Sequence, residues 1–288
     1  MKQKTPNNFC GLPQNHSSYK DSAIVIVPVP FDKTSTWGKG ADKGPKAIIE
    51  ASKNMELYDI ETGSEVYKKG IHTSKAIISS TPAGMVNSVY NRTAKYISDG
   101  KFAVVLGGEH SVSFGSIKAH AESSKDMSIL HLDAHSDMRD SYEGSKYNHA
   151  CVMARAKEVS DTIVSVGIRS MDSSELGNIN TQNMFYASYI QKNKNWMEQA
   201  IKKLSANVYI TIDLDVFDPS IMPSTGTPEP GGLGWYEVLE LLQRVSIKKN
   251  IVGFDIMELC PSSVDKAPDF LAAKLIYKLL SFKFLKKR

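Results

Sequence analysis

Short apolar runs rich in β-branched residues recur along the chain, and stretches with helical periodicity lie between them. The runs predict strands at 23–29, 102–106, 128–132, 162–167, 208–212 and 251–256. The periodic stretches predict helices at 45–52, 86–98, 113–123, 194–203, 235–245 and 270–284. This alternation is typical of parallel strands that helices cover on both faces. The sequence therefore predicts an α/β protein with three layers, α/β/α, around a mostly parallel sheet.

No linker rich in Pro, Gly or Ser interrupts this alternation, and the composition does not shift along the chain. Residues 1–288 are therefore predicted to form a single domain. The stretch PSTGTPEPGGLG at 223–234 is predicted to be a long loop. Loops of this length within a compact domain are often functional.

Composition narrows the range of functions. The chain has 288 residues, 41% of them hydrophobic and 23% charged, as in ordinary globular proteins. A net charge of +4 gives little reason to expect nucleic acid as a partner. The three cysteines are odd in number and lack CxxC spacing, and no apolar run approaches the roughly 18 residues of a membrane helix. Without the apolar core of a signal peptide, a cytoplasmic enzyme that binds neither nucleic acid nor membrane is expected.

Acidic and histidine side chains follow three of the predicted strands directly. ILHL runs into an Asp-x-His-x-Asp motif, VYITI into Asp-x-Asp, and FAVVL into Gly-Gly-Glu-His. Residues two apart in extended backbone share a face, and ligands of parallel sheets bind beyond the carboxyl ends of the strands. A lone Asp-x-Asp is commonly a turn or cap, but three such motifs together indicate a metal site. The candidate ligands are His110, Asp133, His135, Asp137, Asp213 and Asp215.

The charge of this set predicts how many ions it binds. The negative charge of four carboxylates exceeds the positive charge of one divalent ion. Without cations the carboxylates would repel one another and be driven to protonate. Oxygen-rich sites with two imidazoles and no thiolate suit Mn²⁺ better than structural zinc. We therefore expect two Mn²⁺ ions per subunit. Such a pair lowers the pKa of a bridging water, so hydrolysis is the expected reaction.

The motifs GGEHS, DAHSD, DLDVFDPS and TGTPEPGG, together with PFDKTSTWGKGADKGPKAIIEAS near the amino terminus, carry a family resemblance. From about Val25 to the last helix the chain resembles the ureohydrolase family of arginases and agmatinases, and most of all the agmatinases. The resemblance implies the arginase-like fold and a trimer or hexamer. It implies that His110 and Asp137 bind one manganese, that His135 and Asp215 bind the other, and that Asp133 and Asp213 bridge them. A metal-bridging hydroxide would then attack the guanidinium carbon.

The resemblance also assigns roles in catalysis. His149, in YNHACVM, matches the proton shuttle of the family, and Asp137 counts as both ligand and catalytic residue. Glu258, in GFDIMELCP, matches the carboxylate that binds the guanidinium in a charge-assisted pair. Asp255 on the same strand is either a support for the site or a buried structural carboxylate.

The substrate depends on the loop at 138–148, which reads MRDSYEGSKYN. The Asn and Ser residues with which arginases hold the carboxylate of arginine are not recognisable there. Tyr142, Glu143 and Asn148 are expected to face the other end of the substrate, where a Glu favours a terminal amine. Arg139, in contrast, could meet a carboxylate if it turned inward.

These residues favour agmatine as the small-molecule guanidino substrate, hydrolysed to putrescine and urea as in polyamine biosynthesis. The alternatives are an aminopropylagmatine ureohydrolase, an arginase, a guanidinobutyrase or a formiminoglutamase. Deacetylases of related fold need only one zinc, and an inactive binding module would not need the complete residue set.

Overall fold

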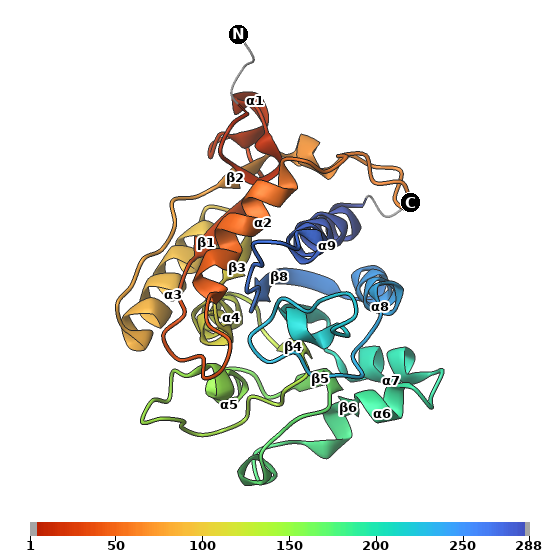
Figure 1. Cartoon of the computed structure of the whole chain (residues 1–288). Coiled ribbons are helices and arrows are strands. Elements are labelled where there is room, and N and C mark those ends of the chain that lie inside the picture. Colours follow the sequence, from red (N-terminus) through yellow and green to blue (C-terminus); the bar gives the residue numbers. More distant parts are fainter. Residues whose placement is uncertain (1–4, 286–288) are drawn as a thin grey trace.

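A sheet of eight strands forms the centre of the molecule (Figure 1). The computed structural model describes residues 5–285. The strands are β1 (Ile24–Val29), β2 (Ile71–Thr73), β3 (Phe102–Gly107), β4 (Met127–Leu132), β5 (Ile163–Ile168), β6 (Met184–Tyr186), β7 (Asn207–Asp213) and β8 (Asn250–Met257). Their order across the sheet is β2-β1-β3-β8-β7-β4-β5-β6, and each neighbouring pair is parallel. All the carboxyl ends therefore meet at one edge of the sheet.

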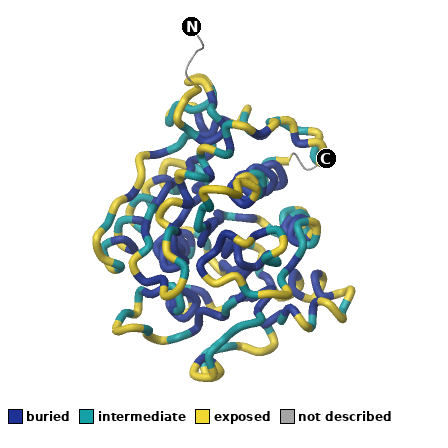
Figure 2. Tube along the Cα trace, in the orientation of Figure 1, coloured by how far each residue is buried: buried dark blue, intermediate teal, exposed yellow. Residues whose placement is uncertain are grey.

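Helices cover both faces of this sheet. They are α1 (Gln14–Ser17), α2 (Gly44–Ser52), α3 (Pro82–Ser98), α4 (Ser113–Ser123), α5 (Val152–Ala156), α6 (Ala187–Ile190), α7 (Trp196–Lys203), α8 (Trp235–Lys248) and α9 (Ala267–Phe284). On β1, Ile24 and Ile26 pack in a core with α2, α7, α8 and α9, whereas Val25 and Val27 pack in a second core with α3, α4 and α5. The strands lie buried between these layers (Figure 2). The predicted fold class is confirmed, and the sheet is entirely parallel in the described residues.

The elements that the pattern did not predict are short. Strands β2 and β6 have three residues each and form the two outer edges of the sheet. Helix α3 begins four residues earlier than predicted, because Thr81 accepts a hydrogen bond from the Gly84 amide and Pro82 occupies the first turn. Strands from residue 24 to residue 257 share one sheet. A single domain over 1–288 stays a prediction, since 1–4 and 286–288 lie outside the described residues.

Between residues 5 and 285, no helix has the length and apolar character that crossing a bilayer requires.

Gly108 lets three strand ends come together at the edge where the motifs lie. Its amide donates to the Val29 carbonyl at 3.0 Å, and its own carbonyl accepts from the Glu258 amide at 2.8 Å. A Cβ at this position would lie 1.9 Å from the carbonyl oxygen of Phe31. Only glycine permits this approach, which joins the ends of β1, β3 and β8.

We expect Gly108→Ala to lower the free energy of unfolding by about 3 kcal/mol, because main chain must move to admit the methyl group. This corresponds to a fall of about 6 °C or more in Tm, measured by thermal unfolding. Gly177→Ala is the matched control, since Gly177 is exposed and no atom of residues 5–285 lies within 4 Å of an added Cβ. Equal Tm values for the two variants would contradict this account of Gly108.

Candidate active site and metal centre

Three aspartates at the strand ends each bind a backbone amide through one carboxylate oxygen, and Asp133 and Asp213 do so with the same local geometry. The Oδ1 atom of Asp133 accepts from the His135 amide at 2.5 Å, and Oδ1 of Asp213 accepts from the Asp215 amide at 2.9 Å. The Oδ1 atom of Asp215 accepts from the Ala134 amide at 2.9 Å. The turns at Asp133 and Asp213 explain the spacing of two residues in the motifs. One oxygen of each carboxylate fixes the backbone, and the Oδ2 oxygen remains for the centre of the site.

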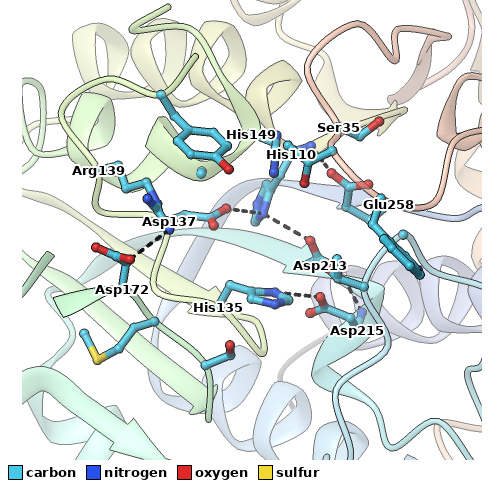
Figure 3. A pocket seen from close by; sticks show the side chains of 18 of the residues that line it. Ser35, His110, His135, Asp137, Arg139, His149, Asp172, Asp213, Asp215 and Glu258 are labelled. Atoms are coloured by element: carbon cyan, nitrogen blue, oxygen red, sulfur yellow. Dashed lines mark hydrogen bonds and ion pairs between the residues drawn. The ribbon is translucent and has the colours of Figure 1, made fainter. Parts of the chain in front are cut away.

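The Nδ1 atom of His110 lies where these carboxylates converge. It is 3.0 Å from Oδ2 of Asp133, 3.3 Å from Oδ2 of Asp137 and 3.4 Å from Oδ2 of Asp213. This buried nitrogen nevertheless has no hydrogen-bond partner among the described residues. On the other side of the centre, Nδ1 of His135 lies 2.9 Å from Oδ2 of Asp215 and 3.6 Å from Oδ1 of Asp133. The structure thus brings all six predicted ligands together. Figure 3 shows His110, His135, Asp137, Asp213 and Asp215 of this set.

Two clusters of possible metal ligands emerge from this arrangement in the described residues. One contains His110, His131 and Asp133, and the other contains Asp133, His135 and Asp215. Asp133 belongs to both, which is the position required of a bridging ligand. His131 was not predicted: its Nε2 lies 2.8 Å from Oδ2 of Asp133, and its Nδ1 lies 3.1 Å from the Ser165 hydroxyl. Its place two residues before Asp133 on the same strand face was the available signal.

The electrostatics of the centre fit divalent cations. Burial and the neighbouring carboxylates of Asp215 and Asp133 raise the pKa of Asp213 well above its ordinary value. Burial alone would lower the pKa of His110, but the surrounding carboxylates raise it well above its ordinary value. Protons are held here because like charges are crowded at low dielectric, and cations relieve the same crowding. The unpartnered Nδ1 of His110 and the oxygen-rich donor set therefore suit metal ions.

Two residues of the site have left-handed backbone conformations, which residues other than glycine rarely adopt. Asp137 has φ 52° and Glu258 has φ 67°. Such conformations cost on the order of 1–3 kcal/mol each and cluster at functional sites. Both residues follow the end of a strand, and both line a cavity of 260 Å³ together with His110, His135, Asp213 and Asp215. The strained turns direct the two carboxylates into this cavity.

Glu258 is fixed within the cavity wall. Its Oε1 atom accepts a hydrogen bond from the His110 amide at 2.6 Å. Burial, followed by the charges of Asp213 and Glu109, raises the pKa of Glu258 well above its ordinary value. A cationic group brought beside Glu258 would favour the ionised carboxylate. Glu258 is therefore placed to receive a cation such as a guanidinium.

The Asp255 carboxylate lies behind His110. It accepts hydrogen bonds from Thr211 Oγ1 at 2.7 Å and from the Tyr209 hydroxyl at 2.8 Å. Thr211 Oγ1 in turn lies 2.8 Å from Nε2 of His110. The sequence left Asp255 as either a support for the site or a buried structural carboxylate. These contacts favour a support for the site.

The predicted substrate residues after Asp137 lie in different surroundings. His149 and Tyr142 line the cavity, with their rings edge to face at 6.2 Å between centroids. Glu143 is exposed in a turn and Asn148 is buried, and neither lines the cavity. The Asn148 side chain instead accepts from the Ala150 amide at 3.0 Å and caps the short 3₁₀ turn His149–Cys151.

The outer end of the cavity contains acidic residues that the sequence did not single out. Asp172 and Glu175 both line it, and each approaches Arg139, with Oδ2 of Asp172 3.5 Å from Nη2 and Oε1 of Glu175 3.8 Å from Nε. The guanidinium of Arg139 also lies over the Tyr142 ring at 4.5 Å. Figure 3 shows Arg139 and Asp172 on one side of His110 and His135 and Glu258 on the opposite side. Arg139 is therefore already engaged by two carboxylates and a ring.

A further residue missed by the sequence analysis holds the loop that was predicted to be functional. Nη2 of Arg169 donates to the carbonyl of Asp215 at 2.6 Å and to that of Glu229 at 2.8 Å, and Nε donates to that of Pro230 at 3.1 Å. Gly226 and Thr227 of this loop line the cavity. Arg169 thus joins the end of β7 to the loop beside the metal centre.

Comparison with known proteins agrees with this geometry. The chain matches the Arginase family over residues 22–281. The N(1)-aminopropylagmatine ureohydrolase of Synechocystis sp. is 40% identical over 96% of each chain, and the agmatinase of Pyrococcus horikoshii is 33% identical over 91% of this chain and 92% of its own. The crystal structure of the agmatine ureohydrolase of Thermoplasma volcanium has a TM-score of 0.87 and 33% identity, covering 96% of this chain and 94% of that one.

These matches span nearly the whole chain, so the chain belongs to the arginase family. It is an arginase-family ureohydrolase, and the predicted enzyme class is confirmed. The arginase family is a family of binuclear metal hydrolases, which accords with the two ligand clusters around Asp133.

We expect Asp133→Asn to weaken Mn²⁺ binding by more than about 100-fold, because outer-shell changes already cost 10- to 100-fold and Asp133 belongs to both clusters. Calorimetric titration of chelator-stripped protein with MnCl₂ measures this loss. Asp126→Asn is the control, since Asp126 is exposed and asparagine tolerates its φ of 51°. Unchanged affinity in Asp133→Asn would refute the assignment of Asp133 as a ligand.

Proposed function

We propose that this enzyme hydrolyses the guanidino group of a substrate whose other end is an amine, either agmatine or N1-aminopropylagmatine. Urea would leave, and agmatine would yield putrescine. The names of the relatives support both compounds, because the Synechocystis protein is an N(1)-aminopropylagmatine ureohydrolase and the Pyrococcus protein an agmatinase. The observation that carries the choice of an amine is the excess of negative charge at the outer end of the cavity.

One cation and two carboxylates meet at that end. Arg139 faces Asp172 and Glu175, so the group carries a formal charge of one negative unit when all three are ionised. Hydrogen bonds from Ser174 and then the charge of Arg139 lower the pKa of Asp172, which keeps it ionised at neutral pH. A substrate carboxylate would be repelled by this excess, whereas an ammonium group would be attracted. This supports a substrate with a cationic tail over arginine or guanidinobutyrate.

The opposite end of the cavity supports a guanidinium. Glu258 is buried, and its Oε1 atom is occupied by the His110 amide. Its Oε2 atom would accept from the planar N–H groups of a guanidinium in a charge-assisted hydrogen bond. This contact would fix the guanidinium carbon beside the metal ligands, and the cationic tail would extend towards Asp172.

The remaining residues would carry the chemistry. His110 and Asp137 would hold one Mn²⁺ ion, His135 and Asp215 a second, and Asp133 and Asp213 both ions. When bound, the two ions would supply Lewis-acid activation of the water nucleophile. His149 would exchange a proton at Nε2 with the reacting groups, and Glu258 would keep the guanidinium oriented.

We also propose that the enzyme acts in the cytoplasm as a homotrimer or hexamer. A reducing compartment suits its cysteines, because Cys10, Cys151 and Cys260 are all free.

Agmatine and N1-aminopropylagmatine should be hydrolysed with a kcat/KM at least about tenfold above that of arginine, guanidinobutyrate or formiminoglutamate, which is about 1.4 kcal/mol of discrimination. The measurement is release of urea, or of formamide from formiminoglutamate, with Mn²⁺ added and again after chelation. Asp133→Asn serves as the control without bound metal. A preference for arginine would contradict the proposed substrate class.

Asp172→Asn should raise KM for agmatine about tenfold and lower KM for guanidinobutyrate, because it removes one negative charge beside the substrate tail. Asparagine keeps the acceptor that caps Ser174, so the local fold is retained. Steady-state kinetics on both substrates checks the opposite shifts. A change of KM in the same direction for both substrates would mean that Asp172 does not interact with the charge of the substrate tail.

A further inference from the structure

Glu109 is a buried carboxylate in the site that neither the metal ligands nor the substrate contacts account for. Its Oε1 atom accepts from the hydroxyls of Thr34 and Ser111, each at 2.6 Å. Its Oε2 atom accepts from the amides of Thr34 at 2.5 Å and Ser35 at 3.1 Å. Four donors from two segments thus converge on one side chain that is fully buried.

Thr34 connects this carboxylate to His149. Its Oγ1 atom accepts from the His149 amide at 3.0 Å and lies 3.4 Å from Nδ1 of the His149 ring. A hydroxyl has one hydrogen, and an acceptor-only carboxylate at 2.6 Å takes it. Thr34 therefore has no hydrogen to donate to the ring. Contact with the ring requires Nδ1 itself to carry the proton.

We propose that Glu109 and Thr34 are positioning residues that fix the tautomer and orientation of His149. With Nδ1–H donating to Thr34, the second ring nitrogen, Nε2, is the one that can accept and release a proton. His149 lines the cavity with Glu258 and the metal ligands, so this nitrogen is offered to the reacting groups. The inference rests on the proposed function, in which His149 exchanges that proton. It assigns the glutamate of the GGEHS motif a task distinct from that of the neighbouring ligand His110.

The alternative is that Glu109 only holds the segment at 34–35 in place. The backbone amides of Thr34 and Ser35 would still bind Glu109 if the Thr34 hydroxyl were removed. Thr34→Val does this with little change of shape, and Thr34→Ser keeps the hydroxyl. The two variants therefore separate orientation of the ring from support of the segment.

We expect Thr34→Val to lower kcat for agmatine by about tenfold or more, because a correctly placed general acid or base contributes about 10²- to 10⁴-fold. KM and manganese content should stay close to the parent values, and Thr34→Ser should retain activity within about threefold. Tm of Thr34→Val should fall by only a few degrees, because Glu109 and the His149 amide each lose one hydrogen-bond partner. Steady-state kinetics, metal analysis and thermal unfolding provide these readouts. Equal activity of Thr34→Val and Thr34→Ser would overturn the proposal.

A double-mutant cycle shows whether the loss passes through His149. In a His149→Asn background, Thr34→Val should change kcat by less than about twofold, because residues that act as one unit are not additive. If Thr34→Val lowered kcat by the same factor in the parent and in His149→Asn, Thr34 would not act through His149.

The ring itself can be observed without any substrate. Nitrogen-15 NMR of histidine-labelled protein, assigned with His149→Asn, should show the Nδ1–H tautomer at His149 in the parent and in Thr34→Ser. Thr34→Val should reduce that population. If the parent hydrolysed no guanidino compound, the proposed function would fail while this measurement still decided the proposal about the ring. A Nδ1–H signal unaffected by Thr34→Val would overturn it.

Discussion

Repulsion between carboxylates at low dielectric is the constraint on which the site depends. Asp133, Asp213 and Asp215 are buried around the imidazoles of His110 and His135. Burial and the neighbouring carboxylates raise the pKa values of Asp213 and Asp215 above their ordinary value. The structure binds one oxygen of each aspartate to a backbone amide and directs the other inward. The parallel sheet makes this possible, because all its carboxyl ends lie at one edge. Cations complete an arrangement that the polypeptide alone leaves electrostatically unbalanced.

The sequence predicted the central part of the fold because burial on both faces leaves a strong signal. Six of the eight strands correspond to apolar runs, and no observed boundary of these strands differs from the prediction by more than one residue. β2 and β6 escaped notice because three residues at a sheet edge carry too little pattern. The helix boundary at Thr81 was missed for a different reason, since capping there depends on a side chain outside the apolar repeat.

The candidate site was predictable where its residues are neighbours in sequence and less so where they meet only in space. Alternate spacing directly after a strand predicts the ligands Asp133, His135 and Asp137. The outer end was misjudged: Glu143 and Asn148 lie outside the cavity lining, and Asp172, which follows β5, lies within it. The contact between Arg139 and Asp172 spans 33 positions of the chain, and the one between Thr34 and Glu109 spans 75. No local pattern encodes such pairs.

Arg169 holds the loop beside the metal centre through the main-chain carbonyls of Glu229 and Pro230, and within residues 5–285 its other hydrogen bonds also go to main-chain carbonyls. These hydrogen bonds do not depend on the side chains of the loop, because every residue has a main-chain carbonyl. Substitutions at positions such as Thr227 can therefore reshape the entrance while the loop keeps its course. The fold in this way separates the metal ligands, whose positions the chemistry restricts, from the loop at 223–234. Side chains of that loop can change the substrate preference without moving the ligands.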